Sequence, residues 1–215
     1  MSLKGVISDL DGVLVNTVPA HFEAWKRMFG EYGVEFTFED YEKKVDGIPR
    51  KDGARAILTD LGEDELEEAA AKKQGYYIKR IETEGVSVYE TSKALIRQLK
   101  DNGVKVAVIS ASKNCALILK KAGYDGLWDA KIDGNDIAKG KPDPDMFLKA
   151  LKRLGLDKSA CIVFEDAVLG VEAAKNAGIF TVGIDRYGDP KRLGKADIIV
   201  KDLGEIDYAG LSGLL

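Results

Sequence analysis

The feature that most constrains the fold is an alternation of apolar strands and helices, preceded by one strand that stands apart. Residues 5–10 form a nearly continuous apolar run, which is typical of a strand covered on both faces. Similar runs recur beyond residue 89, and we expect strands in 104–110, 129–133, 161–166, 179–184 and 197–200. Helical patterns separate most of these runs. This alternation predicts an α/β fold, with a Rossmann-like parallel sheet and helices on both faces.

The segment between the first strand and the rest has a different character. Residues 18–84 contain little that favours strands, and apolar residues follow a helical spacing in 22–29. Residues 63–82 predict a long helix that is acidic at its start and basic at its end, as the helix dipole favours. We therefore expect a core domain of residues 1–16 and 89–215. Residues 17–88 would form a small helical cap domain inserted after the first strand.

Composition and charge exclude several classes of protein. The chain has 215 residues, of which 45% are hydrophobic and 32% charged, as in soluble globular proteins. The net charge is −4 and no basic run could neutralise a nucleic-acid backbone, so we expect no nucleic-acid partner. No apolar stretch approaches the roughly 20 residues of a membrane helix. Cys115 and Cys161 fit no metal or disulfide spacing, so we expect a cytoplasmic protein.

Polar side chains follow three of the predicted strands and one later loop. In open α/β sheets, ligands bind at the carboxyl ends of the strands. We therefore expect these residues to share one rim of the sheet: Asp9 and Asp11 after the first strand, Ser110 to Asn114 after the second, Lys141 in a loop, and Glu165 and Asp166 after 161–164.

Four carboxylates on one rim repel one another, and burial adds to the cost of ionising them. Oxygen ligands of this kind suit a hard divalent cation, and Mg²⁺ commonly binds a few carboxylates together with substrate phosphate. The turn at 110–114 precedes a helix and predicts an anion site. This combination predicts phosphoryl transfer with Asp9 as nucleophile and Asp11 as general acid and base.

Four short motifs carry a resemblance to a known family. Asp9-Leu10-Asp11-Gly12-Val13, Ser110, Lys141-Pro142 and Glu165-Asp166 occur in the order found in the haloacid dehalogenase superfamily. The chain resembles the branch of that superfamily with a small helical cap. The resemblance implies that Asp9 is phosphorylated and that Asp11 is the general acid and base. It also implies that Ser110 and Lys141 hold the transferring phosphoryl group. Mg²⁺ would be held by Asp9, the backbone carbonyl of Asp11 and Asp166, assisted by Glu165.

Within that branch, the sequence is similar to the β-phosphoglucomutase-like phosphomutases and phosphatases. The matching stretches are "HFEAWK", "DGIPRKDG", "AKKQGYYIKRI" and "SASKN". The resemblance implies that the following residues contact a small-molecule sugar phosphate: His21, Gly47, Arg50, Lys73, Ser112, Lys113 and Asn114. Arg50 would bind a distal phosphate, and His21 would couple substrate binding to cap closure. Asn16 and Glu90-Thr91 depart from the pattern and flank the two junctions of the cap.

Several alternatives stay open at the level of sequence. The chain could be a mutase that converts β-glucose 1-phosphate to glucose 6-phosphate, a sugar-phosphate phosphatase, or a non-catalytic sensor of sugar phosphates. His21 could be a packing residue, Arg50 a surface charge at a helix start, and Lys73 part of a solvated helix face. Lys113 and Asn114 could merely begin a helix. A monomer is expected from the family resemblance.

Overall fold

A central parallel sheet organises the molecule. The computed structural model describes residues 2–215, and in this part of the chain six strands pair in parallel in the order β3-β2-β1-β4-β5-β6. The strands are β1 (Gly5–Asp9), β2 (Lys105–Ile109), β3 (Ala130–Ile132), β4 (Cys161–Glu165), β5 (Phe180–Ile184) and β6 (Ile198–Val200). All six lie within the ranges that the sequence predicts. β1 lies between β2 and β4, so the isolated first strand is at the centre of the sheet.

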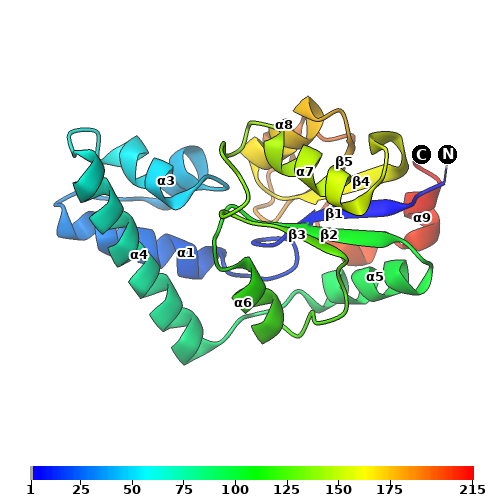
Figure 1. Ribbon diagram of the computed structural model, residues 1–215, viewed down its shortest axis with the longest axis horizontal. Helices are drawn as coiled ribbons and strands as arrows, with labels where there is room; N and C mark the ends of the chain where they lie inside the picture. Colours follow the sequence, from blue (N-terminus) through cyan, green and yellow to red (C-terminus); the bar gives the residue numbers. More distant parts are fainter. Residues whose placement is uncertain (1) are drawn as a thin grey trace.

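Helices cover both faces of this sheet (Figure 1). α5 (Glu90–Asp101), α6 (Cys115–Lys121) and α9 (Tyr208–Ser212) contribute to the apolar cluster on one face, which includes Val6 of β1. α7 (Asp145–Leu154) and α8 (Val168–Asn176) contribute to the cluster on the other face, which includes Ile7. Consecutive residues of β1 therefore enter opposite layers, which explains the unbroken apolar run. Short 3₁₀ helices complete the core: η2 (Lys158–Ala160), η3 (Pro190–Leu193) and η4 (Leu203–Glu205).

The helical insertion lies beyond the end of the sheet opposite the two chain termini (Figure 1). Its elements are α1 (Val18–Glu31), α2 (Phe38–Asp40), the π-helical turn η1 (Tyr41–Val45), α3 (Arg50–Ile57) and α4 (Glu63–Glu84). A separate apolar cluster holds these helices together, with Trp25 and Phe29 stacked and Leu66 buried beside them. We propose on this ground that residues 17–88 act as a cap domain.

Two details of the insertion differ from the sequence-based predictions. The residue pattern of 36–47, "FTFEDYEKKVDG", predicts one helix. The structure divides it into α2 and η1, and a reciprocal Thr37–Asp40 capping box marks its start. α4 continues to Glu84, so its last turn contains no basic residue and the expected basic end is wrong. The acidic first turn, Glu63 to Glu65, is confirmed.

The two chain segments that join the insertion to the sheet lie side by side. Val15 and Val88 form an antiparallel bridge. Asn16 N–H donates to the carbonyl of Ser87 over 2.8 Å, and Tyr89 N–H donates to the carbonyl of Leu14 over 3.1 Å. Any movement of the insertion therefore bends both segments together. Across residues 2–215, every helix is too short or too polar to cross a membrane.

Candidate active site

The carboxyl ends of β1, β2 and β4 meet at one rim, because these strands are adjacent and parallel. A cavity of about 260 Å³ lies between this rim and the insertion. Most of the residues predicted from sequence line it: Asp9, Asp11, His21, Gly47, Arg50, Lys73, Ser112, Lys113, Lys141 and Asp166. Ser110, Asn114 and Glu165 do not line the cavity. Each is hydrogen-bonded to a residue that does, namely Asp11, Gln74 and Lys141 respectively.

Three carboxyl groups form a compact buried cluster at the rim. Asp9, Glu165 and Asp166 each place one carboxylate oxygen within 4.8 Å of the others. Lys141 joins them, with Nζ 2.6 Å from Asp9 Oδ1 and a second ion pair to Glu165. Burial disfavours the ammonium of Lys141, but Asp9 and Glu165 outweigh that effect and raise its pKa. The lysine is therefore charged at every physiological pH.

If all three carboxyl groups are ionised, the cluster carries more negative charge than Lys141 can balance. Burial raises the pKa of Asp9 well above its ordinary value, and Glu165 and Asp11 raise it further against the opposing effect of Lys141. Burial likewise raises the pKa of Asp166, as do the neighbouring carboxylates. A set of buried oxygen donors that repel one another is the donor set that Mg²⁺ prefers. The residues present fit a divalent cation, which would stabilise the ionised form of each carboxyl group.

The turn after β1 brings Asp166 close to the backbone. Gly12 has φ +85°, and a Cβ built there would lie 1.9 Å from Asp166 Oδ2. Only glycine combines this left-handed conformation with the required space. The "DLDG" motif thus contributes a backbone shape as well as two carboxylates.

Asp11 has a set of side-chain contacts separate from those of the carboxylate cluster. Its side chain accepts hydrogen bonds from Ser110 Oγ, at 3.0 Å, and from the hydroxyl of Thr17. His21 Nε2 lies 3.4 Å from Asp11 Oδ1. Burial opposes ionisation of Asp11, but the contacts with His21, Thr17 and Ser110 outweigh it and lower the pKa to about 2. Asp11 is therefore ionised and able to accept a proton. Thr17 is a part of this site that the sequence analysis missed, although it directly follows the first motif.

Lys73 is buried, which rules out a solvated helix face as its environment. Its Nζ lies 2.7 Å from His21 Nδ1 and faces the rings of Trp25 and Tyr77. While Lys73 is charged, its ammonium can only donate, so His21 Nδ1 accepts and the imidazole proton lies on Nε2, toward Asp11. Burial lowers the pKa of Lys73 to about 7, and Arg50 adds to the effect. His21 thus links a lysine of the insertion to the aspartate of the rim.

The loop between η1 and α3 approaches Lys141. Gly47 has φ +73°, and a Cβ there would lie 3.3 Å from Lys141 Cδ. Next to it, Asp46 lines the cavity and accepts a hydrogen bond from Tyr41 Oη over 3.1 Å. Burial raises the pKa of Asp46 to about 6. The sequence analysis missed this carboxyl group, although it stands inside the quoted "DGIPRKDG" stretch.

Arg50, at the start of α3, contacts Gln74 of α4, and Gln74 in turn contacts Asn114. Asn114 also donates to Ser112 Oγ over 3.1 Å. Ser112 N–H donates to Ser110 Oγ over 3.1 Å, which orders the turn after β2. Lys113 is exposed at the cavity mouth. Gln74 is a further residue that the sequence analysis missed.

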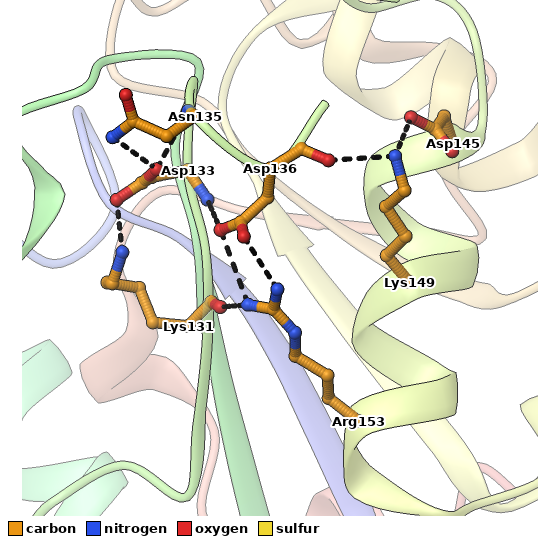
Figure 2. A network of polar contacts seen from close by, with 7 residues as sticks. All are labelled: Lys131, Asp133, Asn135, Asp136, Asp145, Lys149 and Arg153. Atoms are coloured by element: carbon orange, nitrogen blue, oxygen red, sulfur yellow. Dashed lines mark hydrogen bonds and ion pairs between the residues drawn. The ribbon is translucent and has the colours of Figure 1, made fainter. Parts of the chain in front are cut away.

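The chain segment after β3, which leads to Lys141, is held by a polar network that includes Asp133, Asp136 and two residues of α7 (Figure 2). Asp136 accepts from Arg153 Nη2 of α7 over 2.6 Å and from the backbone N–H of Asp133 over 2.9 Å. Lys149, also on α7, donates to the carbonyl of Asp136 over 2.8 Å. These bonds fix the loop to a helix that packs on the sheet. The position of Lys141 therefore depends on α7 as well as on its ion pairs.

Comparison with known proteins identifies relatives over most of the chain. The sequence profile of the haloacid dehalogenase-like hydrolase family matches residues 3–178. A β-phosphoglucomutase of Bacillus subtilis is 33% identical over 211 residues, covering 95% of this chain and 92% of the relative. A validoxylamine A 7'-phosphate phosphatase of Streptomyces hygroscopicus subsp. limoneus is 32% identical over 207 residues, covering 95% of this chain and 96% of the relative.

A solved structure agrees with the architecture described above. The crystal structure of β-phosphoglucomutase from Clostridium difficile superposes with a TM-score of 0.91 at 28% sequence identity. The match covers 98% of this chain and 96% of the other. The likeness therefore extends over the sheet and the helical insertion alike.

Proposed function

Because this chain belongs to the haloacid dehalogenase-like hydrolase family, we propose that it is a Mg²⁺-dependent phosphoryl-transfer enzyme that acts on a hexose phosphate. The specific activity that we propose is that of the β-phosphoglucomutases among its relatives. The enzyme would convert β-glucose 1-phosphate to glucose 6-phosphate. One observation carries the proposal. The carboxylate of Asp9 lines the cavity, bonded to Lys141 and clustered with Glu165 and Asp166.

Asp9 is the nucleophile in the proposed reaction. One of its carboxylate oxygens forms a bond to the phosphorus of a hexose bisphosphate while the bond from phosphorus to the sugar oxygen breaks. The departing sugar oxygen takes a proton from Asp11, which acts as general acid in the protonated form that the second step leaves. Lys141 and Ser110 hold the transferring group, and Lys141 offsets charge on its oxygens. The product of this step is an aspartyl phosphate on Asp9.

In the second step a hydroxyl of the sugar monophosphate attacks the aspartyl phosphate. The new bond from phosphorus to sugar oxygen forms as the bond to Asp9 breaks, and Asp11 takes the hydroxyl proton. Asp11 is ionised before this step, because its hydrogen bonds lower its pKa to about 2, so its carboxylate is free to take this proton. His21 Nε2–H faces Asp11 and orients its carboxylate.

Asp9, Glu165, Asp166 and the backbone carbonyl of Asp11 would hold Mg²⁺ in this proposal. A bound Mg²⁺ would neutralise the cluster and polarise the phosphoryl oxygens. The fit rests on the excess of buried negative charge described above.

The proposed cap domain closes the cavity from above. Gly47 lies over Lys141, and Arg50 would bind the second phosphate of the substrate. Closure excludes water, which would otherwise hydrolyse the aspartyl phosphate. The proposal also includes a monomeric, cytoplasmic enzyme, in keeping with the two free, buried cysteines.

A sugar-phosphate phosphatase is the second candidate, because a phosphatase relative has nearly the same identity as the mutase relative. It would use the same aspartyl phosphate, with water as the attacking group. The two candidates differ only in how completely closure excludes water.

The deciding experiment supplies β-glucose 1-phosphate, Mg²⁺ and a catalytic amount of glucose 1,6-bisphosphate. Glucose 6-phosphate as the main product is expected and supports the mutase. Inorganic phosphate as the main product rejects the mutase in favour of the phosphatase. Binding of sugar phosphates without any turnover would reject both enzyme activities and favour a non-catalytic sensor of sugar phosphates.

A further inference from the structure

A side chain that the proposed reaction does not use joins the insertion to the sheet at the cavity wall. Gln74, on α4, lines the cavity and is half-buried. Its carboxamide oxygen accepts hydrogen bonds from the guanidinium of Arg50 and, over 3.1 Å, from Asn114 Nδ2. Its amide nitrogen donates to Asn114 Oδ1 over 2.7 Å. Gln74 is therefore bonded to both sides of the cavity at once.

The two donors that meet at Gln74 come from different parts of the fold. Arg50 begins α3 in the insertion, whereas Asn114 directly precedes α6 beside the sheet. Ser112 Oγ accepts from Asn114 Nδ2 over 3.1 Å and holds that amide in place. A guanidinium and an amide N–H that converge on one oxygen are arranged as they would be for an oxygen of an anionic group.

We infer that Gln74 is a positioning residue for a distal subsite, made of Arg50, Gln74 and Asn114. By binding both neighbours, it holds the guanidinium of Arg50 and the carboxamide of Asn114 side by side at the cavity wall. It thereby sets the preference for a substrate with a second anionic group, such as the second phosphate of a hexose bisphosphate. This inference rests on the proposed function, which makes Arg50 a ligand of that phosphate.

The experiment compares two inhibitors of p-nitrophenyl phosphate hydrolysis in the presence of Mg²⁺. Glucose 1,6-bisphosphate reaches the distal subsite, whereas inorganic phosphate occupies only the site at Asp9. We expect Gln74→Ala to weaken inhibition by the bisphosphate about three- to tenfold, because the donors lose their shared partner. Gln74→Glu should weaken it by at least about tenfold, because the carboxylate adds a negative charge beside the ligand. Inhibition by inorganic phosphate should change less than about twofold in either variant.

Two further variants serve as references. Ala71→Glu adds the same charge to the exposed face of the same helix, and it should leave the ratio of the two inhibition constants unchanged. Arg50→Ala should lower the preference for the bisphosphate, since it removes the cationic donor of the distal subsite.

Three outcomes would overturn the role of Gln74. If both inhibitors are weakened equally, the contribution of Gln74 is merely structural. If neither inhibition constant changes, Gln74 does not contribute to binding. Tighter bisphosphate binding by Gln74→Ala would show that the carboxamide competes with the ligand. If the unmodified enzyme hydrolyses no phosphate ester, the proposed function fails instead. In that case the shift in unfolding midpoint caused by glucose 1,6-bisphosphate is compared with the shift caused by inorganic phosphate in the same variants. A selective loss of the bisphosphate shift would still support the role of Gln74.

Discussion

At the scale of single residues, the candidate site consists of buried charges whose partners lie far away in the chain. Asp9 depends on Lys141, and Asp11 depends on Thr17, Ser110 and His21. The two aspartates stand two positions apart, yet burial and repulsion raise the pKa of Asp9 while hydrogen bonds lower that of Asp11 to about 2. Neighbouring carboxyl groups with different environments can take different roles in one reaction.

Asp9→Asn should lower the turnover of p-nitrophenyl phosphate by at least about 10⁴-fold, because an amide is far too poor a nucleophile. Asp185 provides a matched control. It follows β5, is as buried as Asp9 and lies outside the cavity lining. Asp185→Asn should keep most of the activity. Normal turnover by the Asp9 variant, measured in the same assay, would end the proposed mechanism.

Lys73 gives the stability of the protein a pH dependence in the alkaline range. The pKa of the Lys73 ammonium falls from its usual 10.5 in the unfolded chain to about 7 in the folded protein, chiefly through burial. Between these values the unfolded chain holds a proton that the folded chain has released, so the free energy of unfolding rises with pH. Lys73→Met should remove this rise in urea unfolding measured from pH 7 to pH 9.

The neighbouring Lys72 is the control for that experiment. It is half-exposed and paired with Glu68, so Lys72→Met should keep the rise of the parent protein. Identical pH profiles for the Lys73 variant and the parent would show that Lys73 keeps its proton in the fold.

At the scale of elements, the insertion contacts the sheet on two sides of the cavity. On one side α4 reaches the turn before α6 through Gln74 and Asn114. On the other side η1 and α2 meet the segment after β5. Glu42 pairs with Arg192 over 2.9 Å, and the rings of Phe38 and Tyr187 lie 5.7 Å apart. These two contacts hold the insertion over the rim.

Arg192→Met should loosen the second contact and admit more water to the aspartyl phosphate. We expect the ratio of inorganic phosphate to glucose 6-phosphate formed to rise about two- to fivefold, since a partly exposed ion pair contributes up to about 1 kcal/mol. Arg55→Met breaks the ion pair with Glu63 inside the insertion and should leave the ratio unchanged. A ratio that is the same in all three proteins would mean that this contact does not control closure.

At the scale of the whole molecule, strands from distant parts of the chain bring charge to one rim. β1 and β4 are neighbours in the sheet, and their ends place Asp9 beside Glu165 and Asp166. In the fold Asp9 is repelled by Glu165 and Asp166, whereas in the unfolded chain it lies far from both. A cation that binds only the folded cluster must therefore stabilise the molecule as a whole.

Mg²⁺ should raise the midpoint of thermal unfolding by about 5–10 °C at a concentration near 100 times its dissociation constant, which corresponds to about 2.7 kcal/mol. A chelator should reverse the rise. Asp166→Asn should reduce it strongly, whereas Asp185→Asn should preserve it. A midpoint that does not respond to Mg²⁺, read by calorimetry, would contradict the assignment of the cluster.

Much of this arrangement was predictable from sequence, because local patterns encode it. An unbroken apolar run such as 5–10 indicates a strand covered on both faces, and the residue after such a strand must lie at its carboxyl end. The buried first strand and the convergence of Asp9 and Asp166 follow from these two regularities. The division of the predicted helix at 36–47 into two elements does not affect the sheet or the residues at its rim.

Only the tertiary structure decided which insertion residues meet the rim. The residue pattern alone does not separate Lys73 from Lys72, and only the family resemblance singles out Lys73. In the fold Lys73 is buried against His21, whereas Lys72 is half-exposed. Gln74 and Asp46 carry no motif of their own. Their contacts depend on how α4 and the loop before α3 settle over the sheet, a packing between segments far apart in the chain that no local pattern specifies.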